Sequence, residues 1–326
     1  MSSLDARLLA TLRATPEHFL PSDLASLVGA DLLHVRERLA ELGRAGFEFE
    51  DRPGFGIRLI AAPDRLIADD LSSRLGASAL VREILVFQKT SSTNDAALQR
   101  GREGAAGGVL ILAEEQESGR GRFGRRWESP AHRGLWLSLL LRPPFPQAQW
   151  PRLTTWAAVS IAAAIDETTR QRTAIKWPND VQFRGKKLAG ILVESGSDRS
   201  GEPFAVLGIG INVNHELADF PPELAEKAGS LRELAGRTFD RTELAAQLIR
   251  ALERRWLQLE DDFPGLVAEA ARRSSLLGKW VQFQSGAVLR EGIAEALDAD
   301  GHLLLRTVSG TLECLTAGEV TLVAGR

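Results

Sequence analysis

The stretch GVLILAEEQESGRGRFGRRWESP, residues 108–130, joins an apolar segment to a loop in which glycine alternates with arginine. The apolar part, residues 108–113, predicts a strand that leads directly into the loop. Gly119, Gly121 and Gly124 formally match the Gly-x-Gly-x-x-Gly pattern of dinucleotide-binding folds. A Rossmann fold needs a helix that begins at the third glycine, and the following Arg-Arg-Trp-Glu-Ser-Pro begins no convincing helix. The loop therefore predicts neither a Rossmann fold nor a P-loop, which would end in Gly-Lys-Ser or Gly-Lys-Thr.

The loop carries a concentrated positive charge. Between Arg120 and Arg133 the sequence has five arginines and one acidic residue. Glycines leave the backbone mobile, and each guanidinium can hold two phosphate oxygens at once. We therefore expect the loop to fold over a phosphate-bearing ligand. The alternative is a solvated loop or an RNA-binding tract, and the apolar strand that precedes the loop favours the ligand site.

Three further segments place polar side chains beside predicted strands. KWPNDV at 176–181 and KLAGILVE at 187–194 predict a strand–turn–strand hairpin, with Lys187 at the mouth of the apolar second strand. GIGINVN at 208–214 puts glycines inside a strand, which permits the close approach of another group. TSSTND at 90–95 predicts a hydroxyl-rich junction between a strand and a helix, which can cap the helix and bind a small polar ligand.

Residues 1–62 predict a separate small unit. Three helices and a β-hairpin follow one another, which is the order of a winged helix-turn-helix domain. The unit has 7 Arg, no Lys and 9 acidic residues, a net charge of −2. A helical interaction module is the alternative, because DNA binding rests on basic surfaces. If the unit binds DNA, the expected contacts are Arg36 and Arg38 on the third helix, and Arg52 and Arg58 on the hairpin.

The remaining chain divides into three parts. Residues 63–80 predict a linker with a short helix. In residues 81–272 strands and helices interleave without a regular βαβ rhythm, which predicts an α+β domain. Residues 273–326 predict short strands joined by turns, including one at Ser285-Gly286, and therefore a small SH3-like β-barrel.

Composition narrows the class of protein. The chain of 326 residues is 44% hydrophobic and 25% charged with a net charge of −3, which excludes disorder and a global basic field. No apolar run approaches the ~18 residues of a membrane span. The N-terminus lacks the apolar core of a secretory signal, so we expect a cytoplasmic protein with no membrane partner. The single cysteine, Cys314, excludes an internal disulfide and a cysteine-based zinc site, and we expect it to be a small core residue.

Taken together, the motifs resemble those of bacterial biotin protein ligases. The order SSTN, Q-x-x-GRGRxGR-x-W, KWPND, KLAGILVE and GIGINVN spans Ser91 to Asn214. The flanking winged helix and SH3-like tail are similar to the bifunctional subgroup, in which the enzyme also represses biotin synthesis. One departure lies inside the motif, because Phe123 stands where the family commonly carries another arginine.

The resemblance implies a reaction in two steps. The biotin carboxylate attacks the α-phosphate of MgATP, which gives biotinyl-5′-AMP and pyrophosphate. A lysine of the biotin carboxyl carrier protein of acetyl-CoA carboxylase then attacks the adenylate and releases AMP. The resemblance further implies a central domain similar to class II synthetases, a homodimer in the ligand-bound state, operator DNA as a second partner, and Mg²⁺ that enters with ATP and has no assigned protein ligand.

The resemblance also implies roles for individual residues. Lys187, Arg122 and Asp180 are the candidate catalytic residues, with Lys187 between the carboxylate and the α-phosphate. Asp180 is a candidate to accept the proton of the acceptor lysine, whose free pKa near ~10.4 leaves it mostly protonated. The candidate biotin-binding residues are Ser92, Thr93, Asn94, Gln116, Arg120, Gly121, Arg122 and Lys187. The candidate nucleotide-binding residues are Arg122, Arg125, Trp127, Asn179, Asp180 and Asn212.

Two other functions fit parts of the sequence. One is a DNA-binding regulator that senses biotin or its adenylate and has lost ligation, and the presence of Lys187 and Arg122 argues against it. The other is a related ligase or acyltransferase that uses lipoate or octanoate, a group that lacks the GRGRxGR loop in this form.

Overall fold

A seven-stranded mixed sheet forms the centre of the molecule, in a computed structural model that describes residues 3–285 and 288–323. The strand order is β3-β4-β5-β9-β8-β7-β6. β3 and β4 run parallel, and every other neighbouring pair is antiparallel. This arrangement confirms the predicted α+β class. The strands are β3 (Glu83–Thr90), β4 (Val109–Gln116), β5 (Gly134–Leu141), β6 (Ala174–Lys176), β7 (Asp180–Phe183), β8 (Lys186–Ser197) and β9 (Pro203–Asn212).

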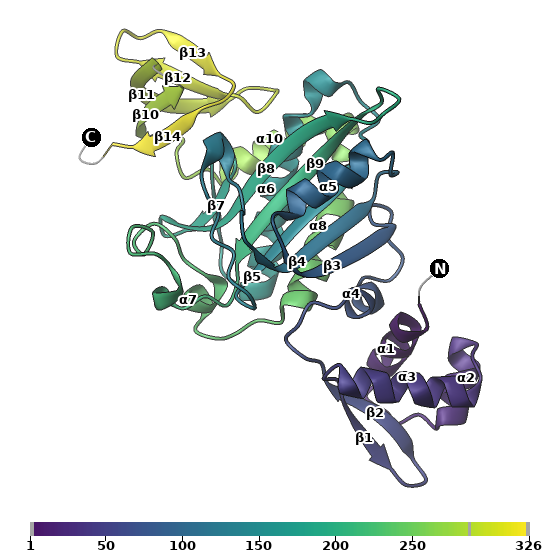
Figure 1. Cartoon of the computed structure of the whole chain (residues 1–326). Helices are drawn as coiled ribbons and strands as arrows, with labels where there is room; N and C mark the ends of the chain where they lie inside the picture. Colours follow the sequence, from purple (N-terminus) through teal and green to yellow (C-terminus); the bar gives the residue numbers. More distant parts are fainter. Residues whose placement is uncertain (1–2, 286–287, 324–326) are drawn as a thin grey trace.

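Helices cover both faces of this sheet (Figure 1). α6 (Arg152–Thr169), α8 (Arg241–Trp256) and α10 (Phe263–Arg272) pack on one face, and α5 (Thr93–Arg102) packs on the other. Residues 156–165 of α6 are all buried and, apart from Ser160, apolar, so this stretch is apolar on all sides, as is typical of a buried helix. The short α9 (Gln258–Asp261) follows α8 directly.

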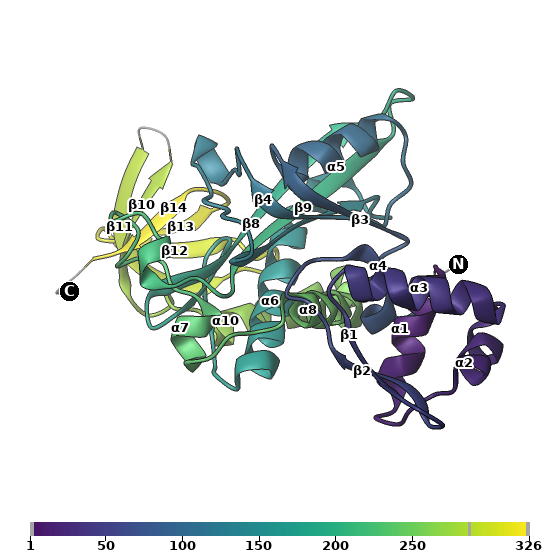
Figure 2. The ribbon, with the colours of Figure 1, turned by 60° about the horizontal axis from the view of Figure 1, so that its bottom comes forward.

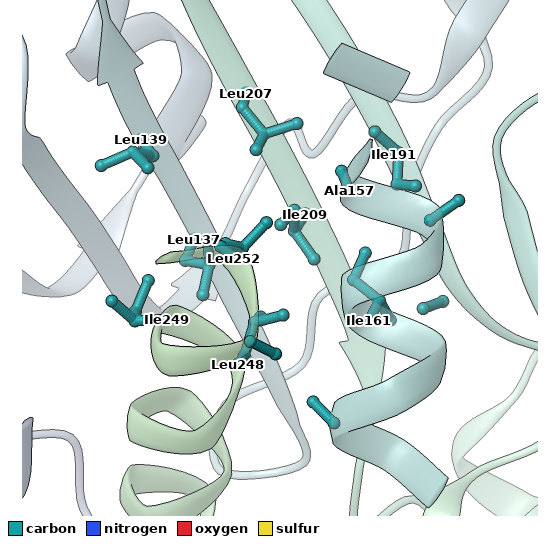
Figure 3. Close-up of a cluster of buried hydrophobic side chains, with 14 of the residues drawn as sticks. Leu137, Leu139, Ala157, Ile161, Ile191, Leu207, Ile209, Leu248, Ile249 and Leu252 are labelled. Atoms are coloured by element: carbon teal, nitrogen blue, oxygen red, sulfur yellow. The ribbon is translucent and has the colours of Figure 1, made fainter. Parts of the chain in front are cut away.

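The two faces of the sheet follow from the alternation of side chains along each strand. On β9, Leu207 and Ile209 point toward α6 and α8, where they meet Ile161 and Leu248 (Figure 3). Successive side chains of a strand point to opposite faces, so the intervening glycines of β9 lie on the face that carries α5. Burial of each such Leu or Ile stabilises the fold by about 1.5–3 kcal/mol. One face of the sheet is therefore covered by the main core, and the other carries α5 and the glycines of β9.

A second, five-stranded antiparallel sheet lies at the C-terminal end, with the order β13-β12-β11-β10-β14. Val281, Phe283, Leu305 and Val320 form its core. Cys314 is exposed, which corrects the expectation of a core residue; its neighbour Leu315 takes the buried position instead. The predicted turn at Ser285-Gly286 includes a residue outside the described ranges. The strands are β10 (Trp280–Ser285), β11 (Val288–Leu297), β12 (Leu303–Thr307), β13 (Leu312–Leu315) and β14 (Glu319–Leu322).

The N-terminal part consists of three helices and a two-stranded antiparallel hairpin, in the predicted order. Asp31 caps the third helix by accepting a hydrogen bond from the backbone N–H of His34 at 2.8 Å. Figure 2 shows this part at the opposite end of the molecule from the C-terminal sheet. The elements are α1 (Leu4–Ala14), α2 (Pro21–Val28), α3 (Leu32–Arg44), β1 (Glu48–Arg52) and β2 (Gly56–Ala61).

The predicted linker contains α4 (Ala68–Leu75), which packs against both α1 and α8. Asp70 of α4 is fully buried and pairs with Arg13 of α1 and with Arg74 of its own helix. Among the described residues, no helix has the length and the apolar character needed to cross a membrane. The remaining elements are α7 (Leu231–Ala235) and three single 3₁₀ turns, η1 (Arg122–Gly124), η2 (Gln147–Gln149) and η3 (Leu217–Asp219).

Candidate ligand-binding site

The candidate site lies on the α5 face of the central sheet, where the start of α5, the end of β4 and the glycine-arginine loop meet. Gly208 and Gly210 of β9 and Gly190 of β8 form its floor. A Cβ atom at Gly210 would lie 2.6 Å from the indole of Trp127, and one at Gly208 would collide with the side chain of Asn94. Glycine is therefore required at these strand positions so that side chains can lie against the sheet.

One wall of the site is a network of neutral polar groups. The backbone N–H and the hydroxyl of Thr93 both donate to Oε1 of Gln116, at 2.8 and 3.1 Å. The hydroxyl of Ser138 on β5 lies 2.7 Å from Oγ1 of Thr93 and 2.5 Å from Oδ1 of Asn94. Ser92 occupies the cap position of α5, but its side chain makes no capping hydrogen bond, contrary to one use predicted for this segment. The wall can therefore present hydroxyl and amide groups to a small polar ligand.

Arg120 anchors the first part of the glycine-arginine loop. Its guanidinium lies 2.6 Å from Asp95 on α5 and 3.2 Å from Glu194 on β8. Burial opposes its charge, but the hydrogen bond that it donates to Asp95 and the charge of Glu194 raise the pKa of Arg120 above its ordinary value. Glu194 also accepts a hydrogen bond from Nδ2 of Asn94 at 2.6 Å, so it connects the loop to the polar wall.

The second part of the loop contacts the C-terminal sheet. Arg122 donates to Oδ1 of Asn179 and to the carbonyl of Gly318, both at 3.3 Å, and Arg125 pairs with Glu319. Burial lowers the pKa of Arg122, and the charges of Asp180 and Glu319 oppose that shift. The guanidinium of Arg122 therefore faces the site as a desolvated cation, which strengthens its attraction to an anion.

Phe123, the departure from the resembled motif, has a left-handed backbone with φ of 57°. Its ring is 64% exposed and lies 4.8 Å from the guanidinium carbon of Arg122. The side chain at this position therefore faces solvent beside the loop, and the departure leaves the inner arginines in place.

Lys187 is the third cation of the site, after Arg120 and Arg122. Its Nζ lies 2.7 Å from Oδ1 of Asp180 at the start of β7, and 5.0 Å from the ring centroid of Trp127. Asn212 is buried, and its amide donates to the carbonyl of Lys187 at 3.4 Å and to that of Gly229 at 3.0 Å. The structure therefore places Asn212 beneath the backbone of Lys187, where its amide contacts the lysine's carbonyl.

The structure brings most of the predicted residues to one cavity of about 50 Å³. Asp180 contacts this cavity through Lys187, Arg125 lies outside it on the exposed side of the loop, and Asn212 lies beneath it. The predicted residues that line the cavity are Ser92, Thr93, Asn94, Gln116, Arg120, Gly121, Arg122, Trp127, Asn179 and Lys187.

Sequence reasoning missed several acidic and hydroxyl groups of the site. Asp95, Glu194 and Ser138 carry the hydrogen bonds that fix its arginines and amides. Glu194 ends the motif KLAGILVE, and Ser138 lies in an otherwise apolar strand, GLWLSLLL. A polar residue in the middle of a buried strand is the signal that could have identified Ser138, because it must find a hydrogen-bond partner.

A larger groove of about 410 Å³ adjoins the site. It begins at Arg122 and Asn179 and runs between β8, the start of α6 and the C-terminal sheet. β7 pairs with β8 only as far as Gly190, so the following residues of β8 line the groove. A chain segment lying in this groove would reach the cations of the site from the side.

Three of the four arginines predicted to contact DNA pair with acidic groups of the N-terminal part. Arg38 donates to Asp5 at 2.7 Å through Nε, and Arg52 and Arg58 both pair with Glu50, at 2.8 and 2.6 Å. Arg36 is exposed, and within the described residues no ion pair engages it. The surface therefore offers fewer uncompensated cations than the count of arginines suggests.

The fold and the site define an α+β protein that gathers three cations and a polar wall on one face of a mixed sheet. Residues 86–214 match the Biotin/lipoate A/B protein ligase family, and residues 276–323 match the Biotin protein ligase C terminal domain. The chain is 36% identical to a biotin–[acetyl-CoA-carboxylase] ligase of Mycobacterium tuberculosis, over 79% of this chain and 94% of the relative. It is 29% identical to the bifunctional ligase/repressor BirA of Escherichia coli, over 96% of each chain.

A solved structure has the same fold. The biotin protein ligase of Aquifex aeolicus in complex with biotin and ATP superposes with a TM-score of 0.64 at 28% identity, and covers 74% of this chain and 99% of its own. The chain therefore belongs to the biotin protein ligase family.

Proposed function

We propose that the protein is an ATP-dependent biotin protein ligase, which forms biotinyl-5′-AMP and transfers the biotinyl group to a lysine of a biotin carboxyl carrier protein. The observation that carries this proposal is the convergence of Lys187, Arg120 and Arg122 on one small cavity with a neutral polar wall. The first step must bring a carboxylate against a triphosphate, and two such charges 4 Å apart repel by about 4 kcal/mol near a protein surface. Fixed cations between them offset that repulsion.

Each part of the site suits a different chemical group of biotin or ATP. The polar wall of Ser92, Thr93, Asn94 and Gln116 suits the ureido ring of biotin, which both donates and accepts hydrogen bonds. Lys187 then lies between the biotin carboxylate and the α-phosphate. Arg120, Gly121 and Arg122 belong to the loop that closes over both groups.

The nucleotide side of the site is formed by the loop and by β7. Arg125 would exchange its partner Glu319 for the leaving pyrophosphate, and Trp127 would pack beside the adenine. Asn179 and Asp180 offer the amide and carboxylate oxygens that Mg²⁺ prefers, beside the place where the phosphates must lie. Mg²⁺ brought by ATP would neutralise phosphate charge, and Asp180 would accept the proton of the acceptor lysine. Asn212 contributes by holding the backbone of Lys187.

The adjoining groove is the route that we assign to the acceptor. It opens onto Arg122 and Asn179, so a lysine that enters through it meets the adenylate beside Asp180. The carrier protein would dock over the free part of β8 and the C-terminal sheet. We also propose that residues 1–62, 81–272 and 273–326 are distinct domains, that the central one is class II synthetase-like, and that the last is an SH3-like barrel.

A biotin-dependent exchange of labelled pyrophosphate into ATP tests the first step alone. We expect exchange with biotin and MgATP, and none when biotin is omitted or replaced by lipoate or octanoate. Exchange that requires lipoate or octanoate would favour the related ligase instead. Tight binding of biotin without exchange would favour a regulator that senses biotin.

A role in repression is supported by the winged-helix order of the N-terminal elements and by similarity over 96% of the bifunctional Escherichia coli relative. Because Arg38, Arg52 and Arg58 already have acidic partners, one unit would gather few phosphate contacts. We infer that DNA binding requires a ligand-bound homodimer, in which two units add their contacts through effective concentration. A mobility shift on DNA upstream of the organism's own biotin genes tests this, and no shift with biotin and ATP at low salt would contradict it.

A further inference from the structure

Three side chains of different ligand types meet on the C-terminal sheet, outside the candidate cavity, and one of them, His302, also lines the adjoining groove. Asp298 follows β11, His302 precedes β12, and Cys314 lies on β13 opposite Leu304. Oδ2 of Asp298 lies 3.1 Å from Nδ1 of His302 and 3.5 Å from Sγ of Cys314. The three ligand atoms lie within 4.8 Å of one another.

The carboxylate of Asp298 is held in this position by the turn that follows it. Its Oδ1 accepts hydrogen bonds from the backbone N–H groups of Asp300 and His302, both at 2.9 Å. Oδ2 therefore remains directed at the imidazole and the thiol. The carboxylate is fixed by backbone N–H groups, and the imidazole lies against it, before any ion binds, which lowers the entropic cost of binding.

We propose that Asp298, His302 and Cys314 form a binding site for Zn²⁺, with a water as the fourth ligand. A thiolate, an imidazole and a carboxylate form a ligand set that suits Zn²⁺, at ligand distances of about 2.0–2.3 Å. Tetrahedral geometry then places ligand atoms about 3.3–3.8 Å apart. The two separations from Asp298, 3.1 and 3.5 Å, are close to this range, and all three ligand atoms lie within 4.8 Å, so side-chain rotations can bring them to one ion. Exposure of Cys314 leaves the fourth position open to solvent.

The thiol proton is the group that the metal would replace. The thiol donates a hydrogen bond to Oδ2 of Asp298 across 3.5 Å. A divalent cation between the two groups would take the place of this proton, because a coordinating thiol is deprotonated. The lone cysteine in the sequence predicted no cysteine-based zinc site, and only the fold brings a histidine and a carboxylate to it.

The proposed zinc site is separate from the ligase reaction, and a bound ion would affect the contacts of the turn that carries it. The turn at 298–302 contacts the central domain through Gly301, whose carbonyl accepts a hydrogen bond from Nε1 of Trp177 at 3.0 Å. Asp300 of the same turn pairs with Arg152 of α6 at 2.8 Å. A bound ion would therefore stiffen the connection between the C-terminal sheet and the rim of the groove.

Titration of the full-length reduced protein with Co²⁺ tests the site independently of ligase activity. We expect one equivalent to bind with a thiolate-to-cobalt charge-transfer band, which Zn²⁺ then abolishes by displacement. Cys314 is the chain's single cysteine, so this band can arise from no other residue. Cys314→Ser should lose the band, and His302→Gln should weaken binding at least tenfold.

Matched variants distinguish a defined metal site from non-specific binding of the cation to acidic residues. Asp298→Asn keeps an oxygen for the two backbone hydrogen bonds and should also weaken binding at least tenfold. Asp300→Asn removes a neighbouring carboxylate that is not a ligand and should bind Co²⁺ like the wild type. Absence of a thiolate band in the wild type would overturn the proposal, and so would equal zinc affinity in Cys314→Ser.

Discussion

Nζ of Lys187 lies 2.7 Å from Oδ1 of Asp180, so the central cation of the proposed site already holds a carboxylate. In the proposed reaction the biotin carboxylate and the α-phosphate compete with Asp180 for this ammonium. The side chain of Lys187 is 34% exposed and that of Asp180 is 23% exposed, which leaves both accessible to ligand. We expect ligand binding to release Asp180 from the lysine, so that it can serve the acceptor.

Replacement of Lys187 should impair the first step and spare the fold. We expect Lys187→Gln to slow biotin-dependent pyrophosphate release by about 10²–10³-fold, the usual effect of removing one stabilising group at a developing charge. The neighbouring Lys186 pairs with Glu233, away from the cavity, so Lys186→Gln is the matched control and should act like the wild type. Pyrophosphate release at the wild-type rate in Lys187→Gln, with an unchanged circular dichroism spectrum, would refute the assignment.

Arg122 should be needed to retain the adenylate. Its side chain faces the cavity, whereas Arg126 of the same loop is 67% exposed and pairs with Glu128. We expect Arg122→Gly to leak biotinyl-5′-AMP, detected as biotin on lysines of bystander proteins, and Arg126→Gly to retain it. Biotin with ATP should also protect the loop from cleavage after Arg120, Arg122 or Arg125 by trypsin. Tight retention in Arg122→Gly, or equal cleavage with and without ligand, would contradict the role of the loop as a clamp.

A buried ion pair fixes the linker to the central domain. Arg241 at the start of α8 is fully buried and lies 2.7 Å from Glu114 of β4 and 2.9 Å from Asp64, while Glu114 also accepts the backbone N–H of Leu66 at 2.6 Å. Arg241→Met leaves the carboxylate of Glu114 buried without its cation, so we expect the free energy of unfolding to fall by about 3–5 kcal/mol. Urea denaturation measures this loss.

The exposed pair between Arg254 and Glu167 provides the control for this measurement. Arg254→Met should change the free energy of unfolding by less than about 1 kcal/mol, because solvent screens such pairs. Equal effects of the two substitutions would show that the buried pair does not stabilise the linker.

His215 should give the protein a stability that depends on pH. Its ring stacks on Phe220 at 5.0 Å, and burial lowers its pKa to about 4, with Asp219 opposing and Arg133 assisting the shift. An unfolded histidine titrates near ~6.5, so between pH 4 and 6.5 the unfolded state binds more protons than the folded state. The contribution of His215 to the free energy of unfolding therefore falls by about 1.4 kcal/mol for each pH unit as the pH drops through this window.

Comparison of the wild type with His215→Phe isolates this contribution, since phenylalanine keeps the stack on Phe220 and cannot be protonated. Denaturation at pH 7 and at pH 5 should show a smaller loss of stability in the variant. Equal losses in the two proteins would mean that the imidazole is protonated in the folded state at pH 5.

The sequence predicted the fold where local pattern and packing agree. The apolar segment before the loop forms β4, and the alternation in GIGINVN places glycines on the α5 face and Ile209 and Ile211 on the core face. Lys187, Arg120 and Arg122, which the sequence motifs singled out, line one cavity, and their roles in the reaction stay a prediction. These features depend on neighbours that are close in the sequence.

Contacts between distant segments could not be predicted in this way. Glu319 approaches Arg125 only because the C-terminal sheet folds back onto the loop, and Glu114 meets Arg241 across 127 positions. Cys314 was assigned to the core from its residue type, but the register of β13 turns it outward and gives the inner position to Leu315. Partners of this kind are determined by topology, which short-range periodicity does not encode.

Transfer of labelled biotin to a carrier domain tests the central proposal most directly. The full-length protein is incubated with labelled biotin, MgATP and a biotin carboxyl carrier domain, and the product is analysed by mass spectrometry. We predict one biotinyl group on the acceptor lysine, formed only with ATP and lost when that lysine is replaced by arginine. A carrier domain that remains unlabelled, while the same preparation binds biotin, would contradict the assignment of the protein as a ligase.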